Sequence, residues 1–100
     1  MDVVFKALAD PTRRHVLQLL KQGPMTAGEI AEHVSIAKPT LSGHLALLRQ
    51  AELVGSEKNG TSITYWLNAT VLQEALLAFA DALGLGISSD KRRLRSARRS

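Results

Sequence analysis

Residues 27–53, AGEIAEHVSIAKPTLSGHLALLRQAEL, constrain the fold more than any other stretch of this 100-residue chain. Thr26 and Glu29 fit the S/T-x-x-E pattern, in which both side chains cap the first turn of a helix, and they predict a helix over residues 27–34. A short turn follows, and a second helix is predicted from residue 38 because a proline stands in its first turn. The stretch therefore predicts two helices joined by a tight turn.

The second of these helices has one apolar side and one polar side. Leu41, Leu45 and Leu48 recur at i, i+4 and i+7, which is the spacing of a buried helix face. The residues outside this face are mostly short or flexible, and a helix that carries them can approach the groove of a nucleic acid closely. Gly43 supports this interpretation. A glycine lowers helix propensity by about 1 kcal/mol relative to alanine, so a helix face that meets only solvent is expected to carry alanine, lysine or glutamate at this position instead. The candidate DNA contacts are Lys38, Pro39, Thr40, Ser42, Gly43, His44 and Arg49.

An alternating pattern replaces the helical spacing after residue 52. Two runs rich in β-forming residues, 53–58 and 61–67, flank Asn59-Gly60, and this dipeptide predicts a β-hairpin with a two-residue turn. The residues at the predicted tip are Lys58, Asn59 and Thr61. They either serve the turn and solubility or, beside a DNA-reading helix, contact phosphate or the minor groove.

Two helices are predicted before this central stretch. The first covers residues 2–9, and Asp10 then caps a second helix that begins at Pro11. Arg13 and Arg14 lie near the start of the second helix. They are either solvated side chains that pair with a nearby aspartate, or contacts to phosphate.

The last predicted helix, residues 69–83, is apolar around most of its circumference. A chain of this size has too little core to cover such a helix, so we expect it to form a homodimer interface together with the apolar first helix. The alternative is that the helix lies on the core of its own chain. The expected interface residues are Val4, Phe5, Leu8, Leu72, Leu76, Phe79 and Leu83.

The positive charge is concentrated at the C-terminus. The formal net charge is +4, but residues 1–89 hold seven basic and eight acidic residues, a formal charge of −1. We therefore divide the chain into a domain over residues 1–84 and a basic tail over residues 85–100. The tail either touches the DNA backbone or only aids solubility. Its candidate backbone contacts are Lys91, Arg92, Arg93 and Arg95.

Several functions are excluded by what the sequence lacks. Without cysteine the chain has neither disulfides nor thiolate metal sites, which fits a cytoplasmic protein. No apolar run approaches the roughly 20 residues that span a membrane, and no signal peptide is recognisable. Glu29 and His33 are spaced to share a metal ion, but two ligands do not make a site. No nucleophile–base pair or phosphate loop is present, so we expect no enzyme, cofactor or bound metal.

The predicted order of elements, helix–helix–helix–helix–strand–strand–helix (α-α-α-α-β-β-α), is that of a winged helix-turn-helix domain, a mainly α fold with a small β-hairpin. At residue level the chain resembles the ArsR/SmtB family of bacterial transcriptional repressors, and within it the SdpR-like autorepressors, which lack a cysteine metal site. The motifs that carry the resemblance are FKALADPTRR (5–14), MTAGEIA (25–31), KPTLSGHL (38–45), KNGT (58–61) and LNATVLQ (67–73).

The resemblance implies a homodimer on a palindromic DNA operator, joined by its first and last helices. It implies DNA contacts from Lys38, Thr40, Ser42 and the residues at 43 and 44. It also implies contacts from the wing, which is the predicted β-hairpin. Ala37 departs from the family, which often caps this helix with serine or threonine, and Gly43 stands where a larger polar residue often reaches the bases. The alternative function is a winged-helix module for protein contacts. An inducer or a regulatory protein partner is compatible with either function.

Overall fold

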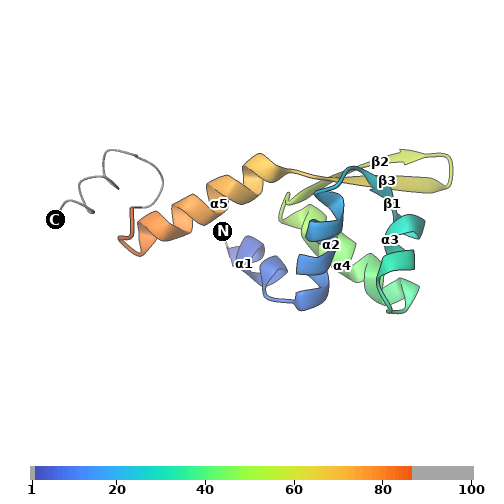
Figure 1. Cartoon of the computed structure of the whole chain (residues 1–100), viewed down its shortest axis with the longest axis horizontal. Helices are drawn as coiled ribbons and strands as arrows, with labels where there is room; N and C mark the ends of the chain where they lie inside the picture. The colour runs from blue at the N-terminus through green and yellow to red at the C-terminus, as the bar shows by residue number, and fades with distance from the viewer. Residues whose placement is uncertain (1, 87–100) are drawn as a thin grey trace. The chain divides into compact units, whose positions relative to one another are not determined.

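The computed structural model describes residues 2–86, and the predicted tail contacts Lys91, Arg92, Arg93 and Arg95 lie outside the described residues. Its elements are α1 (Asp2–Leu8), α2 (Pro11–Leu20), β1 (Met25–Thr26), α3 (Ala27–His33), α4 (Lys38–Gln50), β2 (Val54–Asn59), β3 (Ser62–Leu67) and α5 (Ala69–Ala82) (Figure 1). The chain divides into two compact units, Met1–Ala69 and Thr70–Ser100. This division differs from the predicted one after residue 84, which stays a prediction.

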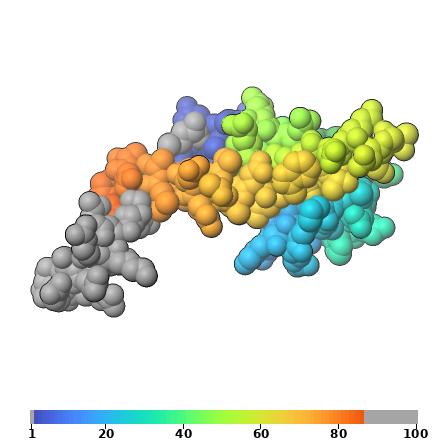
Figure 2. Space-filling model, turned by 90° about the horizontal axis from the view of Figure 1, so that it is seen from above, coloured from blue at the N-terminus to red at the C-terminus, as the bar shows by residue number. Residues whose placement is uncertain are grey.

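The sheet of the first unit has three antiparallel strands in the order β1-β3-β2. The sequence predicts only the hairpin. Strand β1 was missed because two residues, Met25 and Thr26, are too few to show an alternating pattern. Met25 of β1 pairs with Tyr65 of β3, so β1 anchors the start of α3 to the sheet. In Figure 2 the tip of the hairpin, coloured yellow-green, projects beyond α3 at one end of this unit.

The hairpin turn lies one residue later than predicted. Asn59 pairs with Ser62 as the last step of the ladder, so the two turn residues are Gly60 and Thr61 rather than Asn59 and Gly60. Gly60 has a φ of 61°, whereas Thr61 does not take a positive φ. A positive φ at the first central residue alone is the pattern of a type II′ turn, which favours glycine at that position. The glycine therefore sets the register.

Side-chain caps start two of the helices as predicted. The Oδ2 atom of Asp10 accepts a hydrogen bond from the backbone N–H of Arg13 at 3.1 Å and caps α2. Both bonds of the predicted capping box are present at α3: Thr26 Oγ1 accepts from Glu29 N–H at 3.1 Å, and Glu29 Oε1 accepts from Thr26 N–H at 2.8 Å. Ala37 gives α4 no side-chain cap.

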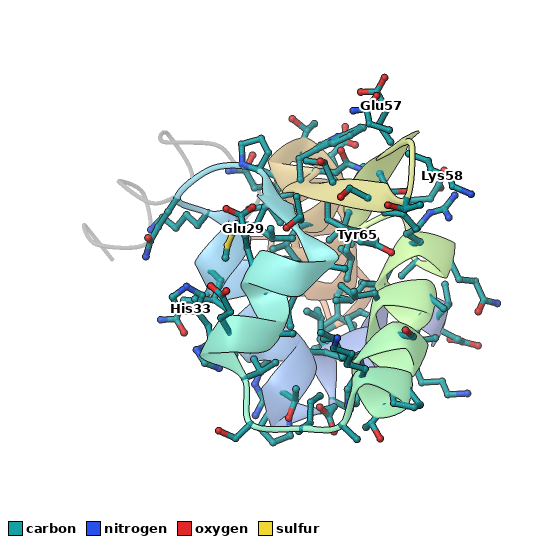
Figure 3. All side chains as sticks on the ribbon, turned by 90° about the vertical axis from the view of Figure 1, so that its right-hand side faces the viewer. Glu29, His33, Glu57, Lys58 and Tyr65 are labelled. Carbon is teal, nitrogen blue, oxygen red and sulfur yellow. The ribbon has the colours of Figure 1, made fainter. Side chains whose placement is uncertain are left out.

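The core of the first unit lies between its helices and the inner face of the sheet. Leu41, Leu45 and Leu48 are buried, which confirms the predicted inner face of α4. Tyr65 of β3 is buried as well, and Figure 3 shows it pointing between the sheet and the helices. The largest fully buried side chains are Ile30, Leu45, Leu48, Leu53 and Val16. This packing fixes which side of α4 faces outward.

The end of α4 is tied to the end of β3. Leu53 N–H donates to Leu48 O at 3.0 Å and Glu52 N–H donates to Arg49 O at 2.9 Å, the two bonds of a Schellman motif. Glu52 takes a φ of 62°, a left-handed conformation that glycine usually supplies. Asn68, which follows β3, donates Nδ2–H to Glu52 O at 3.0 Å and its backbone N–H to Leu53 O at 2.9 Å.

Helix α5 belongs to the second unit. It ends in another Schellman motif, in which Leu85 N–H donates to Ala80 O at 2.9 Å and Gly84 N–H donates to Asp81 O at 2.9 Å. Gly84 has a φ of 78°, so the predicted glycine stop is confirmed. Within residues 2–86 no helix is both long enough and apolar enough to cross a membrane.

Candidate DNA-binding site

The outer face of α4 is polar and open. Lys38, Pro39, Thr40, Ser42, Gly43 and Arg49 are all exposed, as the sequence predicts. The buried leucines on the opposite face hold the helix to the core, so this polar surface needs no further partner within the fold. Such a surface, built on a rigid helix, has the form of an element that enters a major groove.

Packing within the chain does not require Gly43. A Cβ atom placed there meets no atom within 4 Å. An alanine would fit this position and would favour the helix by about 1 kcal/mol. The glycine is therefore unexplained by the fold and leaves room for a second molecule to approach the backbone of α4.

A shallow pocket of about 200 Å³ separates α3 from the first turns of α4. It is lined by Ala27, Gly28, Ala31, Lys38, Leu41, Ser42 and Leu45. The α3 side contributes only small side chains. They leave Lys38 and Ser42 accessible from the α3 side as well as from solvent.

The tip of the hairpin presents a second exposed polar surface. Lys58, Asn59 and Thr61 are exposed. In Figure 3 Lys58 points to the side on which α4 lies, whereas Glu57 points away from the helices, as successive residues of a strand must. Because the side chains alternate along the strand, the Lys58 ammonium, and not the Glu57 carboxylate, points to the side on which α4 lies.

His44 behaves differently from the other predicted contacts. Its side chain is only 16% exposed, and its Nδ1 atom lies 3.0 Å from Arg13 Nη1. Its Nε2 atom lies 3.9 Å from Asp10 Oδ2. The backbone N–H of Arg13 donates to the Asp10 carboxylate and holds the pKa of Asp10 below its ordinary value of 3.8, although desolvation opposes this shift. The ring of His44 is therefore engaged within the chain.

The arginine pair at the start of α2 caps the end of α1. Arg13 donates Nε–H to Ala7 O and Nη2–H to Lys6 O, both at 2.8 Å. Arg14 donates Nη1–H to Leu8 O at 2.7 Å. Two cations at the carbonyl end of a helix also interact favourably with its dipole. The sequence left the partners of these arginines open, because the carbonyls that they bind carry no sequence signal.

The predicted Glu29–His33 pair lies on a surface away from α4. Both residues are exposed, and Figure 3 shows them on the side of α3 opposite to α4. Glu29 is already used in the capping box. Among residues 2–86 no group of three or more histidine, aspartate or glutamate side chains has a geometry that could hold a metal ion.

The sequence model of the family described as "Bacterial regulatory protein, arsR family" matches residues 10–56. The "Transcriptional repressor SdpR" of Bacillus subtilis (strain 168) is 55% identical over 76 residues, which are 76% of this chain and 84% of that protein. The chain belongs to the ArsR family. The "Arsenical resistance operon repressor" of Staphylococcus aureus is 34% identical over 76% of this chain and 73% of that protein.

Solved structures of the ArsR family share the fold. The structure described as "ArsR family transcriptional regulator, RHA00566" aligns with a TM-score of 0.76 at 30% identity, and the alignment covers 89% of this chain and 92% of that one. The "ArsR-like Transcriptional Regulator from Rhodococcus sp. RHA1" aligns with a TM-score of 0.72 at 26% identity over 98% of this chain and 89% of that one. The winged helix-turn-helix prediction is confirmed.

This ArsR-family chain is a DNA-binding transcriptional regulator and not an enzyme. The residues matched by the family model begin at the cap of α2 and end within β2. They include the whole polar face of α4. The tip of the wing and the apolar helix α5 lie outside that match.

Proposed function

We propose that this ArsR-family regulator binds a palindromic operator as a homodimer and represses transcription, that of its own gene included. The observation that carries the proposal is the exposed polar face of α4 above its buried leucines. A bacterial regulator of this kind acts on DNA in the cytoplasm, which is where we place it.

Within the proposed complex, α4 lies in the major groove. Lys38 binds phosphate or a guanine edge, while the hydroxyls of Thr40 and Ser42 bind bases or phosphate. Gly43 lets the backbone approach, and Pro39 offers an apolar contact. Arg49 at the far end of the helix suits phosphate. We leave His44 out of the contact set, because its ring is held by Arg13.

The wing and the tail add contacts to the DNA backbone in this proposal. Lys58, Asn59 and Thr61 reach phosphate or the adjacent minor groove, which the orientation of Lys58 supports (Figure 3). The tail residues Lys91, Arg92, Arg93 and Arg95 neutralise further phosphates. Residues 1–89 carry no net positive charge, so these local cations supply most of the electrostatic attraction.

The proposed dimer rests mainly on α5. Leu72, Leu76, Phe79 and Leu83 follow a 4-3-4 spacing, which is the seam pattern of helices that pack together. Leu76 is 47% exposed, Phe79 41% and Leu83 60%. The expected contributors from α1 are less accessible: Val4 is buried, and Phe5 and Leu8 are half-buried. The first helix therefore supplies the smaller part of the interface.

The proposal is tested by footprinting the DNA that flanks the gene and then measuring affinity against salt concentration. Lys38→Ala should lower the affinity and reduce the log–log salt slope by about two units in a dimer, because each phosphate-bound lysine contributes about one. If Lys38 reads guanine instead, the variant should lose discrimination among operator sequences. The matched control is Lys21→Ala, an exposed lysine outside the proposed interface, which should behave like the unaltered protein.

Two outcomes contradict the proposal. A flat salt slope would favour the alternative, a winged-helix module that makes protein contacts. No protected fragment on any promoter tested would do the same. We expect no metal response, so a change of DNA affinity at stoichiometric zinc or nickel would overturn that part.

A further inference from the structure

One guanidinium joins three helices of the first unit. Arg13 of α2 binds the carbonyl oxygens of Lys6 and Ala7 at the end of α1, both at 2.8 Å. The remaining Nη1 atom lies 3.0 Å from Nδ1 of His44, in the middle of α4. Through a histidine adjacent to Gly43, Arg13 thus holds α4 to the C-terminal end of α1. We call α4 the recognition helix, because it is the helix proposed to enter the major groove.

This contact requires a neutral His44. A guanidinium has only hydrogen-bond donors, so Nδ1 of His44 must accept, and the single ring proton is then on Nε2, which faces Asp10 Oδ2 at 3.9 Å. A proton on Nδ1 would place two donors and two positive charges at hydrogen-bond distance. The contact with Arg13 would then be lost.

The charged groups around the ring come from the start of α2. They are the Asp10 carboxylate and the Arg13 guanidinium, whereas α1 contributes backbone carbonyls and an exposed Lys6 side chain. The charged residues of α4 itself, Lys38 and Arg49, are exposed toward its ends. A protonated ring would be attracted to Asp10, and this would draw it further from the guanidinium.

We propose that Arg13 and His44 are positioning residues for DNA recognition, and that they hold α4 in its DNA-binding position only while His44 is neutral. The inference rests on the DNA-binding surface proposed above. A recognition helix has to be held to within about 0.5 Å for its side chains to meet base edges. Loss of the Arg13 contact frees α4 to shift on α1 and α2, and operator affinity falls.

The direction of the pH effect is distinctive. Any positive charge that the protein gains as the pH falls by itself strengthens binding to DNA of any sequence. The Arg13–His44 contact predicts the opposite for the operator: at least about a fivefold loss of affinity from about pH 7.5 to about pH 5.5. Binding to unrelated DNA should not weaken over the same range.

The experiment compares two histidine variants of the full chain on the footprinted operator and on an unrelated duplex. His44→Asn offers an amide oxygen near the place of Nδ1 and cannot take up a proton, so it should retain most of the affinity and lose the pH dependence. The control His15→Asn, at an exposed position of α2, should keep the pH dependence of the unaltered protein. Circular dichroism checks that each protein is folded at both pH values.

A measurement without DNA tests the contact itself. Long-range ¹H–¹⁵N spectra of the imidazole should show Nδ1 of His44 unprotonated at about pH 7.5, and Arg13→Lys should alter that signal. Operator binding that is flat or stronger at acid pH, or an unchanged pH profile in His44→Asn, would overturn the inference while leaving the proposed function intact. No operator binding at either pH would instead refute the proposed function.

Discussion

At the residue scale, Glu52 occupies a position whose backbone suits glycine. Its φ of 62° closes the Schellman motif at the end of α4. A side chain in this left-handed region costs on the order of 1 kcal/mol or more. Its backbone atoms make the hydrogen bonds of this turn, including the carbonyl that accepts from Asn68. The strain is therefore tolerated and not compensated by the side chain.

We expect Glu52→Gly to raise the free energy of unfolding by about 0.5 to 1 kcal/mol, since the relief of strain exceeds the entropy that a glycine adds to the unfolded chain. Gln50→Gly is the matched control. It places the same residue two positions earlier, where the backbone is helical, and it should destabilise the protein by about 1 kcal/mol. Urea denaturation measures both changes. If both variants lowered the free energy of unfolding, the backbone at residue 52 would not be strained.

At the element scale, capping decides where the helices begin. The α2 cap uses a charged acceptor, Asp10, and the α3 cap uses the uncharged hydroxyl of Thr26. The two caps therefore respond differently to pH. Helix α4 lacks a side-chain cap, so its position depends on its buried leucines and on the contact between His44 and Arg13.

The Asp10 cap should weaken in acid. The pKa of Asp10 in the folded protein lies below its ordinary value of 3.8, chiefly because the backbone N–H of Arg13 binds the carboxylate. A lowered pKa means that the stabilisation is present above the ordinary value and is lost as the pH falls through the folded-state pKa. Asp10→Asn keeps an oxygen acceptor and cannot ionise, so its stability should converge with that of the unaltered protein in acid.

Denaturation midpoints between about pH 6 and pH 3 test this expectation. Thr26→Ala serves as the control, because it removes a cap without a charge and should cost about 1 kcal/mol across the range. A difference between the unaltered protein and Asp10→Asn that stays constant with pH would refute the assigned role of the charge.

At the scale of the whole molecule, the distribution of charge makes a dimer important for DNA affinity. Residues 1–89 have a formal charge of −1, so a single copy of the DNA-binding surface has few cations to offer. Two linked copies on two half-sites can bind 10²–10⁴-fold more tightly than one, as an order of magnitude. The apolar seam of α5 is the expected link.

The double variant Leu76→Gln/Leu83→Gln should shift the protein toward monomer and weaken operator binding more than about tenfold. Both leucines are exposed: Leu76 lies in α5, and Leu83 directly follows its last residue, seven positions further along the same stripe. Glu74→Gln installs the same side chain on the other side of the helix and should change neither property. Sedimentation velocity measures the assembly and gel shift measures the affinity. A dimer that survives the double variant would contradict the proposed interface.

The sequence by itself determined the elements that depend on local spacing. The leucines at 41, 45 and 48 defined the buried and exposed faces of α4, because helical periodicity converts spacing into direction. The caps at Asp10 and Thr26 were recognisable because each bond spans only three residues. The exposed polar face of α4 and the exposed wing tip followed from the same local rules.

Only the tertiary structure decided the features that depend on contacts between residues far apart in the sequence. Strand β1 exists because Met25 and Thr26 pair with β3, about forty residues later. Helical spacing places His44 on the flank of α4, but its partner, Arg13, is 31 positions away in the chain, and only the packing of α4 on α2 brings the two together. No local pattern encodes such a contact. It nevertheless determines how the recognition helix is held.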